Sequence, residues 1–338
     1  MISRFIPSKR ITGWLCCLLF CLLLSGLLTG CSSNRSVSKT GFFLDTVVSI
    51  TLYHTDRPEP LETCFSLLES YEALFSRTKE GSDVWNINHS DGKPVSVSEE
   101  TAALLHLALQ YAQLSDGAFD PTIASVLSLW NFDADRKTGT VPDASTLTEA
   151  LTHVNYETIQ VSGTSVTLLD PEASIDLGGI AKGYIADRLK ESLLADGCTS
   201  AIIDLGGNIL TIGQKSWRKD FTIGIRNPQP DSSNSIFTAI SCRDQSVVTS
   251  GTYERYFMQN GVTYHHILDP QTGFPANQNL ASVTILSDSS AQGDALSTAC
   301  FVLGAKKGLE LIESLDHTEA LFITDDLKTI VSSGWPAS

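Results

Sequence analysis

The segment Asp294–Thr298 combines a carboxylate and a hydroxyl at a spacing that could bind a metal ion. The apolar residues around it predict a helix, in which residues four apart lie on one face. Asp294 and Thr298 would then converge on one point, and both offer the oxygen ligands that Mg²⁺ prefers. The nearby helix N-terminus would add partial positive charge that favours a phosphate. An acid early in a helix also occurs without any ligand, so this pair alone leaves both interpretations open.

The segment Asp176–Gly183, Asp-Leu-Gly-Gly-Ile-Ala-Lys-Gly, joins a predicted strand to a predicted helix. Its paired glycines would let the backbone approach a ligand closely. Lys182 falls early in the helix, where the dipole disfavours a cation, and this position suggests that it reaches for an anionic ligand. A glycine-rich turn with a solvated lysine explains the same residues. Asp204–Gly207 repeats Asp-Leu-Gly-Gly, either as a faint internal repeat or as a second tight turn.

Two adjacent histidines, His265 and His266, follow a predicted hairpin turn at Asn260-Gly261. Successive strand residues face opposite sides, so only one histidine can face a site. Histidine is the natural general base near neutral pH, although a lone strand histidine can also be structural. No third ligand is spaced to complete a His-x-x-Asp metal site. The nearby segment Thr249–Arg255 lacks the Gly-x-Ser-x-Gly elbow, which argues against a serine nucleophile.

The elements that must position these residues are strands and helices without a regular alternation, which predicts an α+β fold. Strands are expected at residues 41–53, 159–161, 165–169, 200–205, 209–212, 253–259, 262–268, 282–286, 320–324 and 329–331. Helices are expected at residues 61–75, about 98–114, 121–130, 180–194, 291–303 and 306–315.

The N-terminal residues 1–30 have the features of a lipoprotein signal peptide: a basic start, an apolar run from Trp14 to Leu24, and Leu28-Thr29-Gly30 before Cys31. Cys31 would become the acylated N-terminus, and residues 31–40 would form a lipidated flexible tether to a domain at residues 41–338. This predicts attachment to the extracytoplasmic face of the cell membrane by a lipid anchor such as palmitate. An uncleaved N-terminal membrane anchor is the alternative.

The formal net charge of −15 argues against nucleic acid or anionic lipid as the main partner. A phosphate-containing substrate would then need a cation or backbone N–H groups close by. Outside the first 31 residues the cysteines are scattered without metal-ligand spacing, which favours small buried side chains or one optional disulfide over catalysis. They are Cys64, Cys198, Cys242 and Cys300.

The order of these motifs resembles the ApbE-like family, the FAD:protein FMN transferases, formerly described as thiamine biosynthesis lipoproteins. The resemblance covers nearly the whole chain after the signal peptide and implies a single two-lobed catalytic domain. The segments that carry it are Leu44–Ile50, Gly117–Thr122, Asp176–Asp187, Gly206–Asn208, Thr249–Gly251, His266–Gly273 and Asp294–Ala299.

The resemblance also implies roles for individual residues. Contacts to FAD would come from Leu44, Thr78, Ala118, Phe119, Asp120, Asp176, Lys182 and Leu268. Magnesium would be held by Asp294, Thr298, the Gly179 carbonyl and Ser297, and His266 would be the base. The chain departs from the family pattern twice: Leu44-Asp-Thr46 replaces Met-Gly-Thr, and Thr78 stands where some members place an aromatic residue.

The implied activity is magnesium-dependent transfer of FMN from FAD to a Thr or Ser hydroxyl of an acceptor protein, with release of AMP. The acceptors would be flavoprotein subunits of membrane or extracellular electron-transfer systems. Two alternatives remain open on the sequence. The same site could hydrolyse FAD to FMN and AMP, or the chain could be a lipid-anchored solute-binding protein, although such proteins usually have two regular α/β lobes and no Asp-x-x-x-Thr metal pair.

Overall fold

The computed structural model describes residues 35–132, 138–229 and 234–336. The predicted signal peptide at residues 1–30 and the predicted acylation site Cys31 lie outside these residues. No helix within the described parts is long and apolar enough to cross a membrane. Their cysteines Cys64, Cys198, Cys242 and Cys300 are all free thiols.

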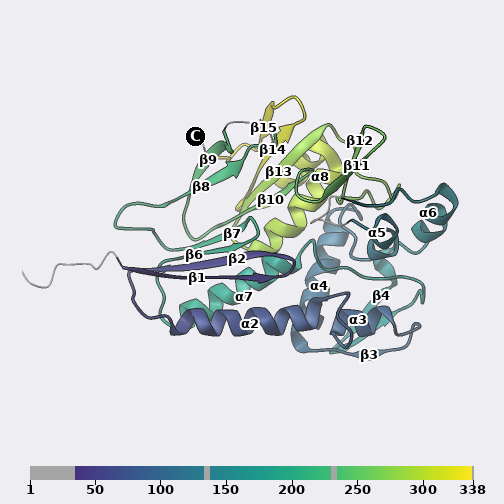
Figure 1. Cartoon of the computed structure of the whole chain (residues 1–338), viewed down its shortest axis with the longest axis horizontal. Helices are drawn as coiled ribbons and strands as arrows, with labels where there is room; N and C mark the ends of the chain where they lie inside the picture. Colours follow the sequence, from purple (N-terminus) through teal and green to yellow (C-terminus); the bar gives the residue numbers. More distant parts are fainter. Residues whose placement is uncertain (1–34, 133–137, 230–233, 337–338) are drawn as a thin grey trace, which may run out of the picture.

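An eight-stranded antiparallel sheet forms the centre of the molecule (Figure 1). Its strand order is β1-β2-β6-β7-β10-β13-β14-β15, so segments far apart in the sequence lie side by side. The strands are β1 (Ser36–Phe43), β2 (Thr46–Tyr53), β6 (Ala201–Leu205), β7 (Asn208–Ile212), β10 (Ser246–Gly251), β13 (Leu280–Ser287), β14 (Thr318–Thr324) and β15 (Thr329–Val331).

Helices cover one face of this sheet and surround one of its ends (Figure 1). The largest apolar core joins α2, α4 and α7 to β2, β6 and β7, while α8 packs against β10, β13 and β14. The helices are α2 (Glu59–Phe75), α3 (Asp83–Asn88), α4 (Glu99–Leu114), α5 (Ala124–Trp130), α6 (Ala144–Leu151), the 3₁₀ turn η1 (Tyr156–Thr158), α7 (Ala181–Ala195) and α8 (Ser290–Glu313).

Three small sheets complete the fold. The β8–β9 hairpin covers the opposite face of the main sheet, where Ile223 and Ile240 pack against Leu321. The β11–β12 hairpin joins α5 and α6 in a separate small core around Trp130. These strands are β8 (Phe221–Arg226), β9 (Ile236–Cys242), β11 (Tyr256–Gln259), β12 (Val262–His265), β3 (Val95–Ser96), β4 (Ile159–Ser162) and β5 (Ser165–Leu168).

The helices α7 and α8 are joined closely at their N-terminal ends. A Cβ atom on Gly183 would lie 2.2 Å from the Ser290 carbonyl oxygen, so only glycine permits this approach. Asp187, one turn further along α7, accepts hydrogen bonds from the Ser289 hydroxyl at 2.8 Å and from the backbone N–H groups of Ser290 and Ala291 at 2.8 and 3.0 Å. The carboxylate of one helix therefore caps the other.

The predicted mixed α+β class is confirmed, but the N-terminal prediction needs two corrections. Residues 41–53 form a hairpin rather than one strand, because Leu44 and Asp45 have φ values of 54° and 57° and reverse the chain in two residues. Residues 36–40 belong to β1 and are not a flexible tether. Pairing with β2 and an ion pair between Lys39 and Glu62 hold this polar segment in place.

Some of the other elements agree with the bounds predicted from the sequence, and some were not predicted. The helices α2, α4 and α7 lie within two residues of the predicted bounds, and α8 joins two predicted helices across a break at Gly304, whose φ is 77°. The elements that were not predicted are α3, α6, β3, β8, β9 and β10.

We predict that Gly183→Ala lowers the free energy of unfolding by about 1–3 kcal/mol, because the added methyl group overpacks the contact between α7 and α8. Denaturant unfolding of the purified protein measures this change. Leu194→Ala, at an exposed position of the same helix, is the control and should change stability by less than about 0.5 kcal/mol. Equal stability of the Gly183 variant and the native protein would contradict the close packing.

Candidate active site

A cavity of about 580 Å³ lies where the N-terminal ends of α7 and α8 meet the β1–β2 turn and the loops after α4 and β12. Its size is typical of a site for a cofactor-sized molecule. Twelve of the thirteen predicted flavin, metal and base residues line it. They are Leu44, Thr78, Ala118, Phe119, Asp120, Asp176, Gly179, Lys182, His266, Leu268, Asp294 and Thr298.

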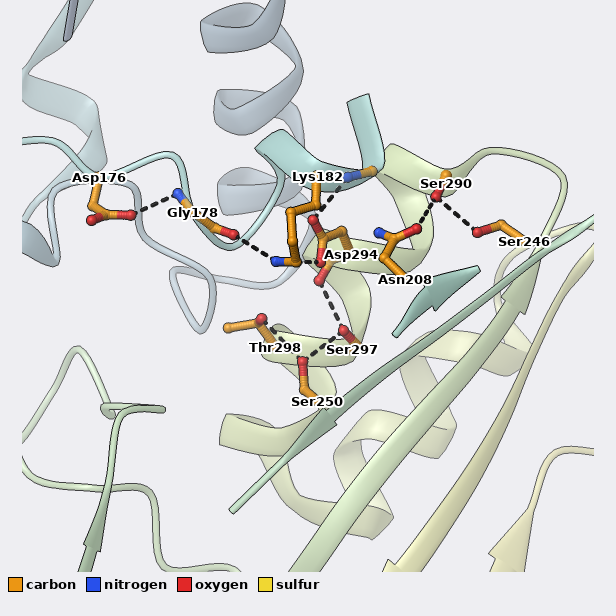
Figure 2. Close-up of polar contacts among 11 residues, drawn as sticks. Asp176, Gly178, Lys182, Asn208, Ser246, Ser250, Ser290, Asp294, Ser297 and Thr298 are labelled. Atoms are coloured by element: carbon orange, nitrogen blue, oxygen red, sulfur yellow. Dashed lines mark hydrogen bonds and ion pairs between the residues drawn. The ribbon is translucent and has the colours of Figure 1, made fainter. Parts of the chain in front are cut away.

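Asp294 is the buried acid at the floor of the cavity, with 4% of its surface exposed. The backbone N–H of Gly183 donates to its Oδ2 at 3.0 Å, and the Lys182 ammonium lies 3.5 Å from its Oδ1 (Figure 2). Lys182 also donates to the Gly178 carbonyl at 3.2 Å. The cation and one N–H group therefore stabilise the charge of a carboxylate that is otherwise removed from water.

The hydroxyl of Thr298 lies on the same side of α8 as Asp294, as the four-residue spacing predicts. The Gly179 backbone comes close to it, since a Cβ atom on Gly179 would lie 3.7 Å from Thr298 Oγ1. A carboxylate, a hydroxyl and the Gly179 backbone thus lie around one part of the cavity.

Ser297 is the one predicted metal ligand that does not line the cavity. Its buried hydroxyl donates to the Asp294 carbonyl at 2.9 Å and lies 2.8 Å from the Ser250 hydroxyl (Figure 2). Ser250 in turn lies 3.5 Å from Thr298 Oγ1. Ser297 therefore links the backbone of Asp294 to the Ser250 hydroxyl through hydrogen bonds. Its role as a metal ligand stays a prediction.

These donors fit magnesium better than a transition metal. Among the residues that the structure describes, no group of three or more His, Cys, Asp or Glu side chains could hold a metal ion. Mg²⁺ commonly binds through one or two carboxylates and keeps waters or substrate phosphates in its other positions. The Asp294 carboxylate and the Thr298 hydroxyl are donors of this kind.

Two further acids shape the cavity wall through their own hydrogen bonds. Asp176 pairs with Arg77 at 2.8 Å and accepts from the Gly178 N–H at 2.6 Å, so it fixes the glycine turn. Asp120 accepts from Thr122 and from the Tyr156 N–H at 3.1 Å. Burial raises the pKa of Asp120, and these hydrogen bonds oppose that shift.

The two histidines face opposite sides, as predicted. His265 is buried beside Phe301 and bonds to the Ala276 carbonyl at 3.2 Å. His266 lines the cavity, and its Nδ1 donates to the Arg255 carbonyl at 3.2 Å. A carbonyl can only accept, so Nδ1 carries the proton and Nε2 has a free lone pair. Burial, with the Arg255 cation nearby, lowers the pKa of His266 to about 3, which keeps the imidazole neutral.

Several charged residues of the cavity wall were not predicted individually, among them Arg226, Glu254 and Arg255. Burial raises the pKa of Glu254 to about 7, although the Lys182 ammonium nearby lowers it. The two arginines add positive charge in an acidic protein, which suits an anionic substrate. The adjacent Glu254-Arg255 pair, five residues after Thr249, was the available signal in the sequence.

One electrostatic expectation is wrong. The first N–H groups of α8 do not face the cavity as a phosphate site, because Ser290 and Ala291 donate to Asp187, and Gln292 donates to Ser289 at 3.3 Å. The helix N-terminus is therefore satisfied within the protein. The positive charge at the cavity comes from side chains instead.

The model of the ApbE family matches residues 44–322. The chain belongs to the ApbE family. Two relatives, both named FAD:protein FMN transferase, support this membership across nearly the whole chain. The protein from Treponema pallidum is 37% identical over 343 residues, with 95% of this chain and 94% of that protein covered. The protein from Klebsiella pneumoniae is 37% identical over 306 residues, with 89% and 93% covered.

Solved structures of ApbE proteins share this fold. The ApbE protein from Thermotoga maritima has a TM-score of 0.81 at 33% identity, and the match covers 88% of this chain and 97% of that chain. The flavin transferase ApbE from Vibrio cholerae has a TM-score of 0.80 at 28% identity, with 89% and 98% covered. The expected single ApbE-like domain is therefore confirmed.

We predict that His266 stays neutral between about pH 5 and pH 8, because its lowered pKa lies below this range. Histidine-labelled protein followed by NMR as the pH is changed measures this directly, and His266→Gln identifies the signal. His265→Gln provides the matched assignment control. A titration of the His266 signal with a midpoint near its ordinary value of about 6.5 would contradict the structure.

Proposed function

We propose that this ApbE-family protein is a magnesium-dependent FAD:protein FMN transferase that attaches FMN from FAD to a Thr or Ser hydroxyl of an acceptor protein. The observation that carries the proposal is one cavity that contains both a magnesium-type donor set, centred on Asp294, and a neutral histidine, His266, with its Nε2 free. The names of its relatives support the same activity.

FAD would lie in the cavity with its phosphates toward Asp294. The wall combines apolar side chains for the ring systems, such as Phe119 and Leu268, with the cations Lys182, Arg226 and Arg255 for the phosphates. Magnesium would be held by Asp294, Thr298 and the Gly179 carbonyl, and would supply charge neutralisation at the pyrophosphate. Lys182, whose ammonium lies 3.5 Å from Asp294, would also contact a phosphate oxygen of FAD.

The transfer exchanges the phosphoanhydride bond of the FAD pyrophosphate for a phosphoester bond to the acceptor. The acceptor hydroxyl oxygen forms a bond to the phosphorus of the FMN part of FAD, and the bond from this phosphorus to the bridging oxygen breaks, so AMP leaves with that oxygen. His266 Nε2 takes the hydroxyl proton. The Arg255 carbonyl, bonded to Nδ1, keeps the ring in the tautomer and orientation that this step needs.

The acceptors that we propose are flavoprotein subunits of membrane or extracellular electron-transfer systems. The lipoprotein-type sequence before Cys31 supports a lipid anchor on the extracytoplasmic face of the membrane. Magnesium as the metal rests on the oxygen donors around Asp294.

Two substitutions should separate binding from chemistry. We predict that His266→Ala lowers the rate of flavin transfer by about 10²–10⁴-fold while FAD binding is kept, because only the proton acceptor is lost. Asp294→Ala should remove transfer and its response to magnesium together. The measurement is intact mass spectrometry of a candidate acceptor domain after incubation with FAD and magnesium, with AMP quantified in the same sample.

Asp288→Ala is the matched control, since this acid is exposed just before α8 and should leave transfer unchanged. The acceptor should gain the mass of one FMN, and EDTA should block both labelling and AMP release. AMP release without labelling of any of several acceptors would favour FAD hydrolysis over transfer. If neither labelled acceptor nor AMP forms, the proposed function is overturned. Native-like transfer by the His266→Ala variant would overturn the role of His266 as base.

A further inference from the structure

The turn between β1 and β2 is strained and forms part of the cavity wall. Leu44 and Asp45 are its two central residues, since Phe43 pairs with Thr46 across the hairpin. Both have left-handed backbone angles, and a two-residue turn of this kind normally uses Asn-Gly or other residues that adopt this conformation easily. A leucine followed by an aspartate does not favour this turn locally, so the surrounding structure must hold it.

A carboxylate on α2 holds the turn through a hydrogen bond to its backbone. Glu72, one turn before the end of α2, accepts a hydrogen bond from the Leu44 backbone N–H at 2.7 Å. Glu72 is half-buried and, like Leu44 and Asp45, lines the cavity. A charged acceptor makes a stronger hydrogen bond than a neutral one, and partial burial limits the competition from water.

The opposite side of the turn is fixed by packing. A Cβ atom on Gly206, in the turn between β6 and β7, would lie 2.2 Å from the Thr46 hydroxyl oxygen. The β1–β2 turn is thus confined between this glycine and Glu72. Figure 1 shows the hairpin running along α2, so the helix that carries Glu72 lies beside the strands that it holds. Among the described residues, Glu72 supplies the one hydrogen bond from a charged side chain to the backbone of Leu44 and Asp45.

We infer that Glu72 is a positioning residue for flavin binding: its carboxylate holds the left-handed Leu44-Asp45 turn in the conformation that completes the cavity wall. This inference rests on the proposed function, because it takes FAD as the molecule that contacts the turn. Glu72 lies on a different element from His266 and Asp294, so it acts on the affinity for FAD and not on the transfer step.

The test compares Glu72→Ala, Glu72→Gln, Asp45→Gly and the double variant Asp45→Gly/Glu72→Ala. Loss of the acceptor in Glu72→Ala should raise the Kd for FAD by about tenfold or more, with kcat at saturating FAD within about threefold of native. Glutamine keeps an oxygen acceptor and should bind FAD within about threefold of native. Glycine adopts the left-handed conformation without strain, so the double variant should recover most of the lost affinity.

Binding is measured by fluorescence titration of FAD, and KM and kcat by acceptor labelling. Glu69→Ala, exposed and one turn earlier on α2, is the matched control and should bind FAD as the native protein does. Native affinity in Glu72→Ala overturns the inference while leaving the proposed function intact. So does a double variant that regains the native melting temperature but not the affinity. Failure of the native protein to bind FAD at all would instead overturn the proposed function.

Discussion

The hydrogen bond from the Gly183 N–H to the Asp294 carboxylate is the contact on which the site depends. It joins the first turn of α7 to α8 at 3.0 Å and uses a backbone donor that a helix N-terminus leaves free. The bond forms only because α7 approaches the Ser290 carbonyl so closely that residue 183 must be glycine. Asp187 secures the same junction by capping α8. One constraint, the close approach of two helices, therefore fixes the orientation of the only carboxylate in the magnesium-type donor set.

The electrostatics of the cavity follow from this arrangement. The chain is strongly acidic, yet the substrate proposed for it is an anion. Cationic groups at the cavity must therefore make the local electrostatic potential positive. The Lys182 ammonium pairs with the Asp294 carboxylate, and Arg226 and Arg255 extend the positive charge along the wall. The backbone carbonyl of Arg255 accepts a hydrogen bond from His266 Nδ1, which leaves Nε2 of the neutral ring free. A base and a binding surface for phosphate can thus coexist without a charged histidine.

The sequence predicted much of this site because its residues belong to short local motifs. Asp294 and Thr298 converge through helical periodicity, and strand alternation correctly separated His265 from His266. The sequence could not show the turn at Leu44-Asp45, because leucine disfavours a left-handed backbone and the contacts from Glu72 and Gly206 come from distant segments. The capping of α8 by Asp187, 102 residues before Ser289, was hidden for the same reason. The β8–β9 hairpin carries no turn signal of the Asn-Gly type, and its place on the far face of the sheet depends on tertiary packing.

The proposed function requires that Asp294, Thr298 and the Gly179 carbonyl hold the metal against the phosphates of FAD. A crystal structure of the protein with FAD and Mn²⁺, a replacement for magnesium that has a measurable anomalous signal, would show whether they do. We expect an anomalous peak within about 2.5 Å of these three oxygen atoms, with a phosphate oxygen of FAD completing the coordination. A peak elsewhere in the molecule, or FAD bound with its phosphates away from Asp294, would contradict this metal site.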